Sequence, residues 1–108
     1  MPRPVDALTA ALLAVWCLTG AAGAVQGAEA EEGRRLAMQW CTLCHIVAPG
    51  QAGSDAAPTF DSIANRAEYS EDGLRAWLAD PHPPMPNLNL SRSEIEHIIA
   101  YLRSLRRE

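Results

Sequence analysis

Residues 41–45 of this chain read Cys-Thr-Leu-Cys-His, the pattern C-x-x-C-H. Side chains three and four positions apart share one face of a helix, so Cys41, Cys44 and His45 are expected to project to the same side. Two thiols placed in this way suit thioether bonds to the two vinyl groups of a haem, with the imidazole beneath the iron. The pattern is typical of c-type haem attachment. It predicts that Cys41 and Cys44 hold a haem covalently and that His45 is its proximal ligand.

Two other interpretations of the cysteine pair find little support in the rest of the sequence. A structural zinc site needs four ligands, but the chain has three histidines and no second cysteine pair. A thiol–disulfide redox pair expects a βαβ context, and no stretch reads as a convincing strand. A zinc or dithiol module is therefore the weaker alternative to haem attachment.

After residue 24, two methionines are candidates for a sixth ligand to the iron, Met38 and Met85. Met38 lies three residues before Cys41 on the same predicted helix, so it cannot easily reach the opposite haem face, and we interpret it as a core residue. Met85 lies far enough after His45 along the chain to cover that face. Because a histidine and a methionine together are the usual ligands of a c-type haem iron, we predict Met85 as the distal ligand.

The segment around Met85 contains a rival ligand. Residues 81–86 include four prolines, which exclude a helix or an inner strand and leave a stiff loop. His82 lies three residues before Met85, and we interpret it as a solvent-facing residue of that loop. His97 lies between apolar positions of the last predicted helix, and we interpret it as exposed.

Apolar periodicity predicts an all-α domain of about four short helices. Ser91 and Glu94 match a capping box at the start of the clearest one, and Ser70 is a candidate cap for the helix before it. A long loop rich in glycine and proline follows the first helix. The expected helices cover residues 31–44, 59–68 and 70–80, and a last one begins at residue 91.

The N-terminal stretch reads as an export signal rather than as part of the fold. Residues 7–20 form an apolar run, and residues 22–24, Ala-Gly-Ala, provide a small-x-small cleavage site. We therefore predict a signal peptide over residues 1–24 and a single domain over residues 25–108. Two alternatives stay open, namely an uncleaved signal that anchors the protein in the membrane and a lipoprotein attached through Cys17.

Length and charge limit the class of protein further. The 108 residues fit one small domain. A hydrophobic core of this size often needs additional stabilisation, for example from a bound cofactor. The net charge of −4, with nine arginines and no lysine, argues against a nucleic-acid binder. The export signal predicts a location in a bacterial periplasm, with membrane contact only if the signal is retained. We expect the free protein to be a monomer.

Five pieces of the chain, taken in order and spacing, resemble the class I mono-haem cytochromes c of small bacterial periplasmic type. They are Gly33 and the stretches 41–45, 57–60 (Ala-Pro-Thr-Phe), 84–86 (Pro-Met-Pro) and 98–102 (Ile-Ile-Ala-Tyr-Leu). The resemblance covers residues 31–105. It implies a cytochrome c fold wrapped around one covalently bound haem c, with the first and last helices crossing.

The resemblance also implies roles for single residues. Gly33 would let the first helix approach the last closely, which explains a costly glycine inside a helix. The Pro58 carbonyl would accept a hydrogen bond from His45 Nδ1–H, which would fix the ring and raise its basicity. The chain departs from the family in two respects. Ala37 stands where many members have an aromatic residue, and the lysine-rich docking face of mitochondrial members is missing.

These features predict one-electron transfer between redox partner proteins rather than enzymatic catalysis. A His45/Met85 pair leaves no open position on the iron, and a methionine sulfur raises its potential. The donor and the acceptor stay open, as does the choice between a free carrier and the haem subunit of an oxidoreductase. A haem-based sensor with a displaceable sixth ligand is a further alternative. The apolar residues expected to exclude water from the haem are Trp40, Phe60, Ile63, Trp77 and Leu88.

Overall fold

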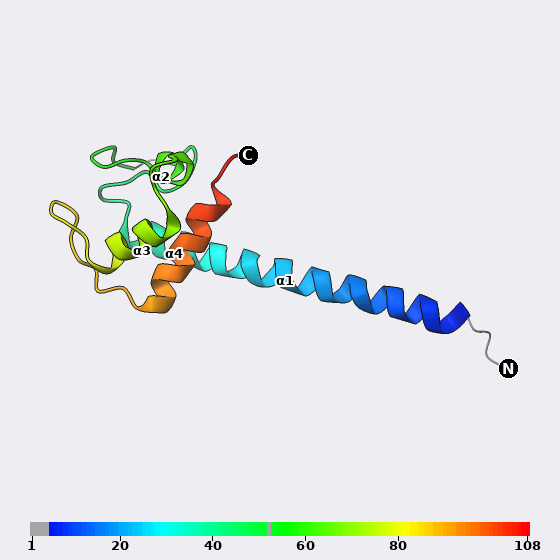
Figure 1. Ribbon diagram of the computed structural model, residues 1–108. Coiled ribbons are helices and arrows are strands. Elements are labelled where there is room, and N and C mark those ends of the chain that lie inside the picture. Colours follow the sequence, from blue (N-terminus) through cyan, green and yellow to red (C-terminus); the bar gives the residue numbers. More distant parts are fainter. Residues whose placement is uncertain (1–4, 52) are drawn as a thin grey trace.

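The computed structural model describes the backbone of residues 5–51 and 53–108, and the side chains of residues 22–51 and 53–108. Within these ranges the secondary structure consists of helices, without a strand, which confirms the all-α prediction. Helix α1 extends from the compact part of the molecule toward the N-terminus, and the other helices gather around its C-terminal half (Figure 1). The helices are α1 (Val5–Trp40), α2 (Phe60–Asn65), α3 (Glu71–Ala79) and α4 (Arg92–Ser104).

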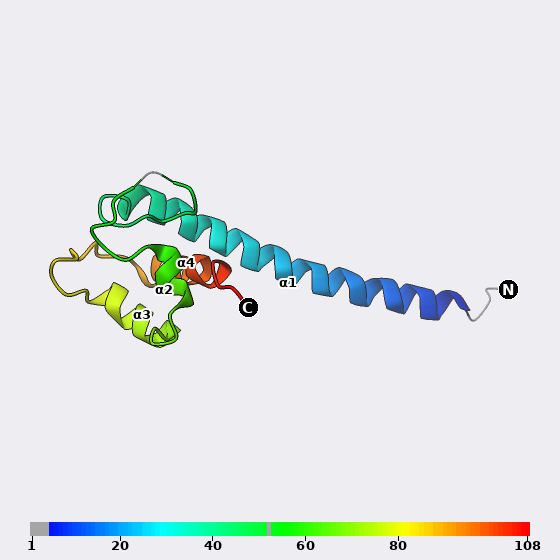
Figure 2. The same cartoon turned by 90° about the horizontal axis from the view of Figure 1, so that it is seen from above.

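The first and last helices cross, as the resemblance implied (Figures 1 and 2). Gly33 of α1 makes the crossing possible. A Cβ atom at this position would lie 1.8 Å from the carbonyl oxygen of His97 and 2.8 Å from Tyr101 Cβ, both in α4. Only a glycine lets the two backbones come this close. His97 is half-buried rather than exposed as predicted, because its turn of α4 lies against α1.

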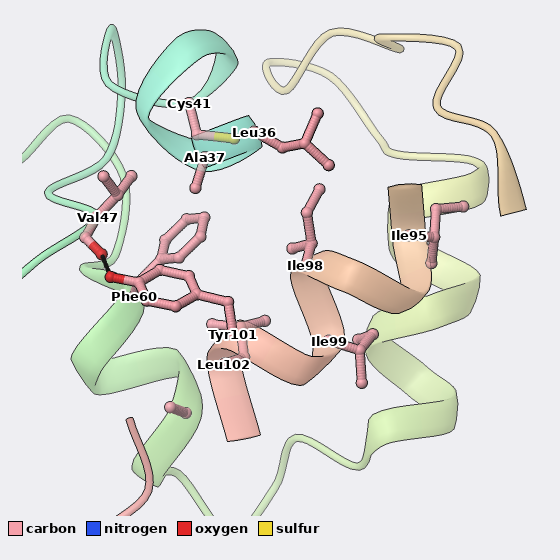
Figure 3. Close-up of a cluster of buried hydrophobic side chains, with 11 residues drawn as sticks. Leu36, Ala37, Cys41, Val47, Phe60, Ile95, Ile98, Ile99, Tyr101 and Leu102 are labelled. Carbon is pink, nitrogen blue, oxygen red and sulfur yellow. Dashed lines mark hydrogen bonds between the residues drawn. The ribbon is translucent and has the colours of Figure 1, made fainter. Parts of the chain in front are cut away.

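The hydrophobic core lies between α1 and α4 and continues to α2. Figure 3 shows Ala37, Phe60 and Tyr101, from three different helices, pointing toward one another. The Tyr101 hydroxyl donates a hydrogen bond to the Val47 carbonyl oxygen at 2.5 Å, which ties the loop after α1 to α4. Ala37 is fully buried in this core. The core contains Leu36, Ala37, Cys41, Val47, Phe60, Ala64, Ile95, Ile98, Ile99, Tyr101 and Leu102.

Helix α1 differs from the prediction at both ends. It is continuous over 36 residues, whereas the sequence predicted a first helix that begins only at residue 31. Residues 22–30 are rich in alanine, which has the highest helix propensity, and this favours the longer helix. The regular helix ends at Trp40 rather than near Cys44, and turns follow it.

Helix α2 is shorter than the predicted 59–68. Thr59 caps its start, because the side-chain oxygen accepts a hydrogen bond from Ser62 N at 3.1 Å. At its end, the Asn65 side chain donates to the Leu105 carbonyl oxygen at 3.1 Å and accepts from Arg107 N at 2.8 Å. These bonds to the chain after α4 hold the end of α2 in place, and the residue that follows is extended.

Helices α3 and α4 begin where the sequence predicted. The Ser70 hydroxyl accepts a hydrogen bond from Gly73 N at 3.0 Å. At α4 both halves of the capping box are present, because Ser91 Oγ accepts from Glu94 N and the Glu94 carboxylate accepts from Ser91 N. Each bond satisfies a backbone N–H group that has no partner inside the helix.

The predicted signal peptide of residues 1–24 lies largely outside the residues whose side chains the structure describes, and so does Cys17. Over the stretches 22–51 and 53–108, no helix is long and apolar enough to cross a membrane. Cleavage of the signal, and the anchor and lipoprotein alternatives, stay predictions.

Helix α3 buries none of its residues fully and is joined to α4 by charged side chains. Arg103 donates two hydrogen bonds of 2.9 Å to the Glu71 carboxylate, and Arg106 and Arg75 each lie 3.4 Å from it. Arg75 also donates to Glu96 at 2.7 Å. The hydrogen bonds from Arg103, with the charges of the three arginines, lower the pKa of Glu71 to about 2.

A Glu71→Gln variant is expected to lose about 1 kcal/mol of unfolding free energy at neutral pH. Because the folded pKa of Glu71 lies below its ordinary value of 4.5, its contribution is present above that pH and is lost as the pH falls toward about 2. The variant should therefore lose stability less steeply in acid than the wild type, as measured by denaturant unfolding at several pH values. Asp55→Asn is the control, because Asp55 is exposed and belongs to the loop before α2 rather than to this ion-pair network. An unchanged acid dependence in Glu71→Gln would contradict this role.

Candidate haem site

Residues 41–45 continue the backbone path of α1 for one more turn. Cys41 N donates to the Ala37 carbonyl oxygen, and His45 N donates to the Cys41 carbonyl oxygen, both at 2.9 Å. Both cysteines are free thiols, Cys41 in the core and Cys44 at the surface. Burial raises the pKa of the Cys41 thiol to about 11, which keeps this thiol neutral at physiological pH. A single turn therefore presents two thiols and an imidazole.

The ring of His45 is held from two sides. Its Nδ1 lies 2.6 Å from the Pro58 carbonyl oxygen. A carbonyl oxygen only accepts, so Nδ1 carries the proton and donates. The ring also meets the edge of Phe60, with centroids 5.4 Å apart and planes at 70°. No hydrogen bond to Nε2 is found in the described part of the chain, and this nitrogen is therefore the one available to a metal.

The loop that follows the turn returns to it and supplies Pro58. Ala57 N donates to the Cys44 carbonyl oxygen at 2.8 Å, and Phe60 N donates to the Ile46 carbonyl oxygen at 3.0 Å. These two bonds lie on either side of Pro58 along the chain. The position of the Pro58 carbonyl is therefore set by backbone hydrogen bonds of the protein itself.

Met85 lies half-buried in the loop between α3 and α4. Its sulfur accepts a hydrogen bond from Trp77 Nε1 at 3.1 Å, and its backbone N–H donates to the His82 carbonyl oxygen at 3.0 Å. Sequence reasoning treated Trp77 only as an apolar residue. An indole N–H group usually finds a hydrogen-bond acceptor, and this property of Trp77 could have suggested the contact.

Met38, the other methionine after residue 24, packs against the core from α1. Its sulfur accepts a hydrogen bond from Gln51 Nε2 at 2.8 Å. Because Gln51 belongs to the loop after the cysteine turn, this contact joins α1 to that loop. The structure thus gives Met38 a packing role, as the sequence predicted.

The residues expected to exclude water differ in exposure. Phe60 is buried, and Ile63 and Leu88 are half-buried. Trp40 and Trp77 are instead 51% and 42% exposed. Trp40 lies about two turns beyond the crossing point at Gly33, so α4 does not cover it. The two indoles therefore lie at the surface, where they can contact a flat apolar group.

The cysteine turn and the loop that carries Met85 lie toward the end of the molecule opposite the N-terminus in both views (Figures 1 and 2). They come from segments that are far apart in the sequence. The donor set consists of two free thiols, an imidazole with Nδ1 already engaged, and a thioether, with aromatic side chains at the surface. These groups fit a covalently attached haem with nitrogen and sulfur ligands.

An all-α fold with a C-x-x-C-H turn at the end of its first helix defines a c-type haem domain. Residues 28–102 match the family model described as cytochrome c oxidase, cbb3-type, subunit III. The chain is 43% identical to cytochrome c-552 of Bradyrhizobium diazoefficiens over 93 residues, which cover 85% of this chain and 89% of that protein. The chain therefore belongs to the cytochrome c family, as a class I mono-haem member with one covalently bound haem c.

A second relative is a larger protein. The chain is 35% identical to cytochrome c oxidase subunit 2 of Alkalihalophilus pseudofirmus, over 61% of this chain and 22% of the relative. No solved structure matches the chain. Membership of the family establishes haem-based electron transfer as the general role of the protein.

Proposed function

We propose that Cys41 and Cys44 form the thioether bonds to the haem and that His45 and Met85 are its two axial ligands. The observation that carries this proposal is the 2.6 Å hydrogen bond from His45 Nδ1–H to the Pro58 carbonyl oxygen. It fixes the tautomer in which Nε2 has a free lone pair, and it orients the ring. Partners of this kind raise the basicity of a histidine that binds a metal.

A haem held by these residues would supply one-electron chemistry. The residues of the chain bind it, orient it and limit its contact with water. Met85 provides a soft sulfur that favours the ferrous state and raises the potential. If His45 and Met85 both bind the iron, no position would be left for a small ligand, which would favour electron transfer over ligand binding.

The partners are proposed to be redox proteins that meet the chain near the cysteine turn. Between residues 36 and 60 the only charged residue is Asp55, and between residues 76 and 91 the only one is Asp80. This part of the chain therefore differs from a lysine-rich docking face. We further propose a periplasmic location, directed by the signal over residues 1–24, and a monomeric free form.

A second candidate function is that of a haem subunit in an oxidoreductase complex. The similarity to subunits of cytochrome c oxidases favours this candidate. The free carrier is favoured by the cytochrome c-552 relative, which matches over nearly its whole length. Co-purification from native membranes distinguishes them, because a subunit stays with its complex and a carrier is recovered alone.

Haem attachment is tested by replacing both cysteines of the turn. A Cys41→Ala/Cys44→Ala variant, exported in a host that matures c-type cytochromes, should lose all haem staining on a denaturing gel. Each single variant should lose at least part of it. Cys17→Ala is the matched control, because this cysteine lies outside the turn and the variant should stain like the wild type. Full staining of the double variant would contradict the assignment of Cys41 and Cys44.

A further inference from the structure

Trp77, near the end of α3, contacts two residues of the following loop. Its indole N–H donates a hydrogen bond to the Met85 sulfur at 3.1 Å. Its ring lies against the His82 ring, with centroids 4.8 Å apart and planes at 46°. The loop closes between these two contacts, because Met85 N donates to the His82 carbonyl oxygen at 3.0 Å. One side chain therefore holds both ends of this turn.

The two residues held by Trp77 are the two candidates for the sixth ligand. His82 offers an imidazole and Met85 a thioether, and either type of group binds haem iron. They lie three residues apart in one proline-rich loop, so the backbone alone discriminates little between them. The contacts of Trp77 do discriminate, because its ring lies tilted against the imidazole while its N–H group donates a hydrogen bond to the sulfur.

We propose that Trp77 is a positioning residue that selects Met85 over His82 as the sixth ligand and tunes the potential through the sulfur. This inference rests on the proposed ligation by Met85. A thioether is a weak acceptor, and an N–H donor withdraws electron density from its sulfur. The sulfur then donates less to ferric iron, which favours the ferrous state and raises the potential. The ring contact separately keeps His82, which is exposed as the sequence predicted, beside Trp77.

Two substitutions separate these effects. Trp77→Phe keeps an aromatic ring for His82 but removes the N–H donor. We expect this variant to retain the weak far-red absorption band of methionine–iron ligation and to have a lower midpoint potential. Trp77→Ala also releases His82, so we expect it to lose most of the far-red band. The double variant Trp77→Ala/His82→Ala should recover the band, because the rival imidazole is gone.

The readouts are the ferric absorption spectrum and the midpoint potential, both recorded on protein with covalent haem. Tyr69→Phe, an exposed aromatic residue outside the site, is the control and should match the wild type in both. The proposal is overturned if Trp77→Phe keeps the wild-type potential, or if removal of His82 does not restore the band in the Trp77→Ala background. A wild-type protein without the band would instead refute Met85 ligation itself, which is a failure of the proposed function.

Discussion

A Met85→Ala variant is expected to keep its covalent haem but to lose the far-red band and bind carbon monoxide in the ferrous state. Cys41, Cys44 and His45 are untouched by this change, so attachment should continue. Loss of the sulfur removes the ligand that favours ferrous iron. The midpoint potential should fall by on the order of 0.1 V, within the ~0.8 V range over which axial ligands set haem potentials. Redox titration and ligand-binding spectra measure both effects.

Met38→Ala is the matched control for this experiment. Met38 is the other methionine of the described residues, and its sulfur contacts Gln51 beside the core. Its removal should cost stability and leave the potential and carbon monoxide binding nearly unchanged. If Met85→Ala kept the wild-type potential and excluded carbon monoxide, another residue such as His82 would be the sixth ligand. If the wild type itself bound carbon monoxide rapidly, the haem-based sensor would be favoured.

A Gly33→Ala variant is expected to lose roughly 3 kcal/mol or more of unfolding free energy, at the upper end of overpacking costs. The added Cβ would lie 1.8 Å from the His97 carbonyl oxygen. Since this neighbour is backbone, no side-chain rotation relieves the contact, and α1 and α4 must separate. For a domain of this size the melting temperature should fall by about 12 °C or more. Thermal unfolding followed by far-ultraviolet circular dichroism measures the change.

Gly27→Ala provides the control within the same helix. A Cβ atom at Gly27 would meet no atom within 4 Å, so this variant should be as stable as the wild type or slightly more stable. The difference between the two variants isolates the helix crossing from the general preference of helices for alanine. Equal stability of Gly33→Ala and the wild type would contradict the close approach of α1 and α4.

The parts of the fold that local chemistry determines could be predicted from the sequence. The start of α4 follows from the capping box of Ser91 and Glu94, and that of α3 follows from the Ser70 cap. The family resemblance added the crossing at Gly33. The apolar stripe of α4 could be read from its helical spacing, since Ile95, Ile98, Ile99 and Leu102 all lie in the core.

The features that depend on contacts between distant segments could not be predicted in the same way. The early end of α2 results from hydrogen bonds between Asn65 and the chain beyond α4. Within the site, the spacing of residues 41–45 indicated the thiols and the imidazole. The contact from Trp77 to Met85 depends on how α3 and the following loop are placed in space. Nothing in the local pattern of either residue specifies that placement.

We propose that this chain carries electrons through a haem bound by residues 41–45 and Met85. The measurement that tests it most directly is the absorption spectrum of the exported wild-type protein, oxidised and reduced, paired with haem staining on a denaturing gel. We predict haem that stays on the denatured chain, a low-spin ferrous spectrum and a weak far-red band in the ferric protein. A colourless protein, from a host shown to mature another c-type cytochrome, would show that residues 41–45 do not bind a haem.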